Sequence, residues 1–258
     1  MALKLISTDF DGTIFSEFEN PPIAKSLQNH LQELRRRGGL WVINTGRDLS
    51  SLLETLGRAQ ISVHPDALVL VEREIYVRHE AHYVPLTDWN TACTRDHKEL
   101  FARVTPDLEA LVGRLEARNR ATFYEDAFSP LCVIGETLAE ANAIHAELEE
   151  YARTVPRLTV VRNDVYIRFA HAGYNKGLAL AEIARRLKIQ AADILVAGDH
   201  HNDLPMLDTA LARWLVAPAN AIPEVKDRVR ALGGYVSSRT HGEGVAQGIE
   251  YVLEQANG

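Results

Sequence analysis

Apolar and polar positions at both ends of the chain follow the pattern of strands that alternate with helices. Short, β-leaning apolar runs predict strands at residues 2–8, 39–45, 193–199, 213–218 and 234–238. Apolar side chains at helical spacing predict helices at residues 26–39, 46–57, 175–189 and 202–210. This alternation predicts an α/β fold with a parallel sheet covered on both faces, which places ligands at the carboxyl ends of its strands.

Two of these helices show a readable apolar face. In the first, the inward positions are expected to be Leu27, Leu31 and Leu34, and Gly38 with Gly39 ends the helix. In the second, the inward positions are expected to be Leu49, Leu52, Leu53 and Leu56.

The middle of the chain has a different pattern. Long, charged helical stretches at residues 99–120 and 137–155 stand among short β-like segments at 122–125, 130–135, 158–163 and 164–170. This mixture is typical of a separate α+β module. We therefore expect a core formed by residues 1–80 and 170–258, with an inserted module at 81–169.

Composition and charge narrow the range of partners. The 258 residues carry a formal net charge of -7, which argues against nucleic acid because phosphate-backbone binding needs a basic surface. No apolar run approaches the roughly 18 to 20 residues of a membrane span, so no membrane partner is expected. Cys93 and Cys132 lie far apart without Cys-x-x-Cys spacing, which fits a reducing compartment and predicts a cytoplasmic protein. A small anionic ligand is compatible with these properties, because local charge can oppose the net charge.

Four clusters of polar residues stand at the ends of predicted strands or at a helix start. They are Asp9 and Asp11; Thr45, Gly46 and Arg47; Asn175 and Lys176; and Asp199, Asn202 and Asp203. Carboxylate oxygens suit Mg²⁺, which takes further ligands from water and substrate phosphate. Thr45 and the backbone at Gly46 can donate hydrogen bonds to phosphate oxygens, and Lys176 can supply positive charge. Together the clusters predict a site for Mg²⁺ and phosphate.

Each cluster alone has an ordinary structural explanation. Acids at a strand end often cap or face solvent, Thr45 and Gly46 alone resemble a turn, and Lys176 alone resembles a solvated lysine at a helix start. A calcium loop is excluded, because aligning Gly12 with its sixth position places Phe18 where the loop needs Glu. His200 and His201 are expected to be loop residues, since Mg²⁺ prefers oxygen ligands.

The four clusters carry a family resemblance. The segments DFDGT, NTGR, NKG and GDHHNDLPM resemble, in this order, the four motifs of the haloacid dehalogenase-like (HAD) superfamily of phosphohydrolases. The segments APANAIPEVKDRV and SSRTHGEGVAQGIEYVL resemble the C-terminal part of its Cof-type and sucrose-phosphatase-like branch. The resemblance covers about residues 2–80 and 170–255. It implies a Rossmann-like, doubly wound parallel sheet with a large α+β cap inserted between the second and third motifs.

The resemblance also implies roles for individual residues. Asp9 would be the nucleophile that accepts the phosphoryl group, and Asp11 the general acid and later the base. Mg²⁺ would be held by the Asp9 carboxylate, the Asp11 backbone carbonyl and Asp199. The phosphate-binding residues would be Thr45, Gly46, Lys176 and Asn202, with Asp203, Arg47 and Asn175 in supporting positions.

These expectations favour a Mg²⁺-dependent phosphatase that acts on a small phosphorylated metabolite, a sugar or polyol phosphate, through an aspartyl phosphate. A phosphotransferase or hexose phosphomutase on the same scaffold is the alternative enzyme. A sugar-phosphate sensor without turnover is a third possibility, although a pure binder has no need of Asp11. Glu72 and Arg73 depart from the family, which commonly has a small-residue turn such as Asn-Gly there, and this departure points to a different substrate group.

Overall fold

The computed structural model describes residues 3–257, and the chain divides into two compact units. The larger unit contains the two ends of the chain, up to Leu86 and from Lys176 onward, and the smaller unit contains Thr87–Asn175. The division falls a few residues after the expected boundaries at 80 and 169. On the N-terminal side the reason is that β5 (His82–Pro85) still pairs with β4 (Glu74–His79) in the larger unit.

The larger unit is built on an eight-stranded sheet with the order β12-β11-β10-β1-β2-β3-β4-β5. Its other strands are β1 (Leu5–Thr8), β2 (Leu40–Asn44), β3 (Ala67–Leu70), β10 (Ile194–Ala197), β11 (Trp214–Ala217) and β12 (Tyr235–Val236). The strands from β12 to β3 are parallel, and β4 and β5 extend the sheet as antiparallel strands. All residues of β1, β3 and β10 are buried, as expected for a parallel sheet with both faces covered. The expected α/β fold class is confirmed.

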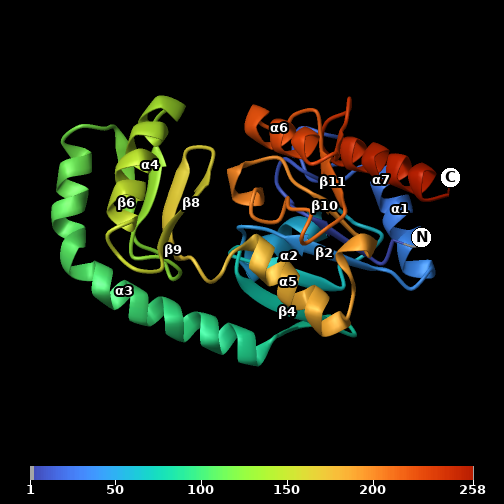
Figure 1. The fold of residues 1–258 in the computed structure, drawn as a ribbon, viewed down its shortest axis with the longest axis horizontal. Coiled ribbons are helices and arrows are strands. Elements are labelled where there is room, and N and C mark those ends of the chain that lie inside the picture. Colours follow the sequence, from blue (N-terminus) through green and yellow to red (C-terminus); the bar gives the residue numbers. More distant parts are fainter. Residues whose placement is uncertain (1–2, 258) are drawn as a thin grey trace. The chain divides into compact units, whose positions relative to one another are not determined.

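The helices of the larger unit pack around this sheet (Figure 1). They are α1 (Lys25–Arg36), α2 (Leu49–Arg58), α5 (Lys176–Leu187), α6 (Pro223–Ala231) and α7 (His241–Asn257), with short 3-10 turns η1 (Ala191–Asp193) and η2 (His201–Asp203). The prediction of a helix at residues 202–210 is wrong. Only η2 forms there, and the Asp203 carboxylate accepts hydrogen bonds from the backbone of Asp199 and His200, which folds the segment back into a tight loop.

Helices α1 and α2 bury most of the leucines predicted for their inner faces. In α1, Leu27, Leu31 and Leu34 are buried as expected. In α2 one assignment is wrong: Leu53 is 41% exposed, and Thr55 is buried beside Leu52 and Leu56 instead. These three follow the i, i+3, i+4 spacing of a single helix face, from which Leu53 is rotated away.

The smaller unit has a four-stranded antiparallel sheet with the order β6-β7-β9-β8. Its elements are α3 (Thr87–Glu116), β6 (Ala121–Tyr124), β7 (Cys132–Gly135), α4 (Leu138–Ala152), β8 (Leu158–Asn163) and β9 (Tyr166–His171). Side chains from both helices and from the sheet form a core of its own, which includes Leu100, Leu115, Ile144 and Phe169. The unit is therefore an α+β module with independent packing.

None of the helices within residues 3–257 combines the length and the apolar character needed to cross a bilayer. The thiol groups of Cys93 and Cys132 are both buried.

Candidate active site

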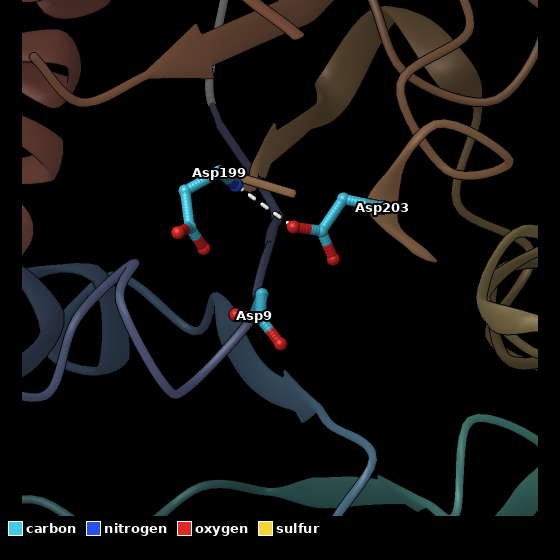
Figure 2. A group of neighbouring side chains, drawn as sticks. All are labelled: Asp9, Asp199 and Asp203. Atoms are coloured by element: carbon cyan, nitrogen blue, oxygen red, sulfur yellow. Dashed lines mark hydrogen bonds between the residues drawn. The ribbon is translucent and has the colours of Figure 1, made fainter. Parts of the chain in front are cut away.

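Three carboxylates converge at the carboxyl end of the parallel sheet (Figure 2). Asp9 follows β1, Asp199 follows β10 two residues after its end, and Asp203 lies in η2. Because β1 and β10 are parallel neighbours, their ends bring Asp9 and Asp199 to the same edge of the sheet. One oxygen of each of the three side chains lies within 4.8 Å of the others. Such a set of oxygen atoms can hold a divalent cation.

Lys176 lies in the middle of this acidic group. Its side chain is fully buried at the start of α5, and its Nζ donates to Asp9 Oδ1 at 2.6 Å and to Asp203 Oδ1 at 2.7 Å. The Asn44 side chain at the end of β2 donates to the Lys176 carbonyl at 2.9 Å and fixes the start of the helix. Lys176 is therefore not a solvated lysine, and these two bonds use two of the three hydrogens of its ammonium group.

Burial and mutual repulsion set the protonation of the group. Burial raises the pKa of Asp9 well above its usual value, and the charges of Asp203 and Asp199 raise it further. Burial and the charge of Asp203 raise the pKa of Asp199 to about 7. Burial of Lys176 lowers the pKa of its ammonium group, but the combined charges of Asp203 and Asp9 outweigh this effect and raise it. One lysine thus faces three acids, and the excess negative charge favours binding of a cation or of protons.

The loop after β1 is shaped to hold Asp199. The Thr13 hydroxyl donates to Asp199 Oδ1 at 2.6 Å. Gly12 has a φ of 76°, and a Cβ atom there would collide with the Asp199 carboxylate, so the position requires glycine. Asn220 donates to the Gly12 carbonyl at 2.7 Å. Neither Thr13 nor Asn220 is among the site residues predicted from the sequence, although Thr13 stands inside the first motif.

Asp11 lies against a different cation. Arg47 binds its carboxylate with two hydrogen bonds, from Nε to Oδ2 and from Nη2 to Oδ1, both at 2.7 Å. The remaining nitrogen of Arg47, Nη1, donates to Ser51 at 3.1 Å and Thr55 at 2.8 Å on α2. The Asp11 side chain is 41% exposed, so it is oriented by Arg47 but accessible to a ligand.

The other residues predicted for the site can be placed one by one in the structure. Thr45 and Gly46 follow β2, and the Thr45 hydroxyl accepts a hydrogen bond from the Arg47 amide at 3.2 Å. The Asn202 side chain donates from Nδ2 to Glu72 Oε1 at 2.8 Å. Asn175 is the residue directly before Lys176 and the last of the smaller unit. His200 and His201 are not part of the acidic group that could hold a metal, as judged over residues 3–257.

This combination of fold and site defines the class of protein. The parallel sheet, with acids after β1 and β10 and a lysine at the start of α5, has the fold of the haloacid dehalogenase-like hydrolases. More particularly, the chain belongs to the sucrose-6F-phosphate phosphohydrolase family, whose family model matches residues 2–252. The resemblance noted in the sequence is confirmed.

Individual proteins agree with this class. The sucrose-phosphatase from Synechocystis sp. PCC6803, solved in complex with sucrose and phosphate, has the same fold: the TM-score is 0.73 at 20% identity, over 97% of this chain and 98% of that chain. A phosphoglycolate phosphatase from Methanopyrus kandleri is 34% identical over 98% of this chain and 99% of its own length. A second phosphoglycolate phosphatase, from Methanothermobacter thermautotrophicus, is 36% identical over 83 residues, so this chain matches about a third of its length (35%). These relatives share a reaction type and differ in their named substrates.

Proposed function

We propose that the protein is a Mg²⁺-dependent phosphatase that hydrolyses a sugar or polyol phosphate through a phosphoryl group carried on Asp9. The observation that carries this proposal is the buried contact of Lys176 with Asp9 and Asp203. A carboxylate that must attack phosphorus has to be ionised, and a buried ammonium group at 2.6 Å favours that form against the effect of burial.

The acidic group fits Mg²⁺. Its donors are carboxylate oxygens, the hard ligands that this ion prefers, and its excess negative charge needs a cation. Asp9 and Asp199 would hold the ion together with the Asp11 backbone carbonyl, while Asp203 orients Lys176. When bound, Mg²⁺ would supply positive charge that reduces the repulsion between the carboxylates and the phosphate.

The remaining residues divide the work of phosphoryl transfer. A carboxylate oxygen of Asp9 attacks phosphorus, and the bond to the leaving oxygen breaks. Asp11 gives that oxygen a proton and then takes a proton from water, which attacks the phosphoryl group and releases inorganic phosphate from Asp9. Lys176, Thr45 and the Gly46 amide would stabilise the charge on the phosphoryl oxygens. Arg47 would hold the Asp11 carboxyl group while it is ionised, which is the form that takes the proton from water.

Two lines of support favour a sugar or polyol as the leaving group. The matching family model is named for a sucrose phosphate and spans almost the whole chain. The net charge of -7 is unfavourable for large polyanionic substrates. Phosphoglycolate is the main competitor, because relatives with that name match the chain.

The test is a panel of phosphate esters, assayed with Mg²⁺, with Ca²⁺ and with excess chelator. The panel contains hexose and polyol phosphates, sucrose 6-phosphate and phosphoglycolate, and the control is Asp9→Asn. We expect the parent protein to release inorganic phosphate from a sugar or polyol phosphate with Mg²⁺, without an added bisphosphate, and to stop in chelator. Transfer to a second sugar hydroxyl would instead identify a phosphotransferase or mutase, and tight binding without release would identify a sensor.

A further inference from the structure

The turn between β3 and β4 is under backbone strain. Val71 has a φ of 50° and Glu72 a φ of 65°, in the left-handed region that tight hairpin turns normally fill with Asn and Gly. A β-branched residue such as Val71 is especially unfavourable there. Strain of this kind persists only where surrounding contacts maintain it, and it is frequent at functional sites.

Hydrogen bonds connect this turn to the expected phosphate-binding loop. The Val71 amide donates to the Arg47 carbonyl at 3.0 Å, and the Glu72 amide donates to the Thr45 carbonyl at 2.9 Å. The Glu72 side chain is buried, and its Oε1 lies 3.4 Å from the point where a Cβ atom on Gly46 would stand. The strained turn therefore places a carboxylate directly beside the loop that carries Thr45 and Gly46.

The Glu72 carboxylate determines how the Asn202 amide is oriented. An amide has a donor edge, its NH₂ group, and an acceptor edge, its carbonyl oxygen, and a half-turn exchanges them. A carboxylate can only accept, so Glu72 binds the NH₂ group, at 2.8 Å. Asn202 is only 8% exposed, and its Oδ1 has no hydrogen-bond partner among residues 3–257. No contact at Oδ1 therefore opposes the amide orientation that the bond to Glu72 favours.

We propose that Glu72 is a positioning residue for phosphoryl transfer, which accepts one hydrogen of the Asn202 NH₂ group and so keeps the second available to a phosphoryl oxygen. In the opposite orientation Asn202 would present its carbonyl oxygen to the phosphate, and two acceptors repel each other. The inference rests on the proposed function, and it adds a residue that none of the four motifs contains. It also explains why the strained turn is maintained, because a turn made of small residues would have no carboxylate at this position.

A double-mutant cycle tests this role. The variants are Glu72→Ala, Asn202→Ala and the double variant, with Glu72→Gln as the conservative change. Glu74→Gln is the matched control, because Glu74 is the next acid of the same hairpin and its carboxylate accepts from the Tyr76 hydroxyl, outside the site. The quantities to be measured are kcat, KM and the melting temperature, together with the affinity for inorganic phosphate in the presence of Mg²⁺ by calorimetry.

We expect Glu72→Ala to lower kcat about tenfold, as for the loss of one hydrogen bond to a charged group. Glu72→Gln keeps an acceptor and should recover most of that loss, and Glu74→Gln should match the parent. In the Asn202→Ala background, removing Glu72 should cause no further loss. A purely structural role would instead lower the melting temperature and add its effect to that of Asn202→Ala.

The outcomes separate this inference from the proposed function. If the parent hydrolyses no ester of the panel, the proposed function fails, and the same cycle is evaluated on phosphate affinity. Additive effects of the two alanine variants, or a Glu72→Ala variant equal to the parent, would overturn the role of Glu72 while leaving the phosphatase proposal intact. A parent that neither turns over esters nor binds phosphate would overturn both.

Discussion

Lys176 has a place both in the stability of the fold and in the proposed chemistry. A fully buried ammonium group is costly unless it is paired, and here two carboxylates pair with it at 2.6 and 2.7 Å. Replacing such a pair with apolar groups can be neutral, but removing a single partner leaves buried charge uncompensated and typically costs about 3–5 kcal/mol. The lysine that contacts the proposed nucleophile therefore also stabilises the folded protein.

Lys176→Ala tests both effects at once. We expect kcat to fall by about 10² to 10³, the usual cost of losing one positioned electrostatic donor. We also expect a lower melting temperature in metal-free buffer, because Asp9 and Asp203 lose their shared cation. Lys25→Ala is the control, since Lys25 also begins a helix but is exposed. An unchanged kcat in Lys176→Ala would remove this lysine from the reaction.

The two acids of the first motif have different expected tasks, and an activated substrate separates them. Asp9→Asn removes the attacking oxygen, so an aryl phosphate should not restore turnover. Asp11→Asn removes only proton transfer, so an aryl phosphate, whose leaving group needs little protonation, should be hydrolysed better than an alkyl phosphate. Intact mass after rapid quench should show an added phosphoryl group only when Asp9 is present. A phosphoryl group found on Asp11 would reverse the assignment.

Helix α2 contributes to the site through a buried hydroxyl group. Thr55 takes a place on the inner face of α2, between Leu52 and Leu56, and accepts a hydrogen bond from Arg47 at 2.8 Å. Arg47 in turn holds Asp11 with two bonds. Helix α2 is thus connected to Asp11, the proposed proton donor, through one arginine.

Thr55→Val measures this contribution. Valine has nearly the shape of threonine and suits a buried position, so the melting temperature should not fall. We expect kcat to fall several-fold, because Arg47 loses one of the hydrogen bonds that hold its guanidinium group. Leu53→Ala, on the exposed face of the same helix, should leave kcat unchanged. Equal activity of Thr55→Val and the parent would show that Ser51 and Asp11 suffice to hold Arg47.

The same helix shows where sequence reasoning succeeds and where it stops. Apolar spacing correctly predicted the helix, since α2 spans Leu49–Arg58, but it assigned Leu53 to the core and overlooked Thr55. Hydropathy ranks leucine above threonine, and it does not show that the buried Thr55 hydroxyl is satisfied by accepting from Arg47 and donating to the Ser51 carbonyl. Likewise, the motifs pointed to the residues after β1 and β10, whereas Glu72 and Asn220 make contacts between distant segments that have no local sequence pattern.

The metal-free protein should be less stable as the pH rises. The pKa of Asp199 is raised to about 7, above the value near 4 of an unfolded carboxyl group. Between these values the folded protein binds more protons than the unfolded chain, so the free energy of unfolding decreases from about pH 4 to pH 7. Asp9, whose pKa is also raised, acts in the same direction.

Mg²⁺ should therefore stabilise the protein more at pH 8 than at pH 5, because protons compete with the ion at the lower pH. The measurement is the melting temperature with and without Mg²⁺ at the two pH values. Asp199→Asn is the comparison, and it should reduce both the pH dependence and the gain from Mg²⁺. An equal gain at pH 5 and pH 8 would argue against an ion bound by these carboxylates.

The sequence predicts an inserted module because the charged helices of the middle contrast with the apolar runs at the ends. The boundaries of the inserted module were harder to predict, since His82–Pro85 is a mostly exposed edge strand with no continuous apolar run. Its place in the sheet depends on pairing with β4, and the hydropathy pattern of a sequence does not show which strands pair.

The interruption of the larger unit by the smaller one also affects biosynthesis. Strand β1 pairs with β2 early in the chain, but its second neighbour, β10, is translated only after the whole of Thr87–Asn175. At about 5–20 residues per second the ribosome needs roughly 5 to 20 seconds for that segment. During this time the nascent chain has no β10 to cover one edge of β1, and an open edge can pair with other chains. The strand that leads to Asp9 is therefore the one that a chaperone at the ribosomal exit has most reason to shield.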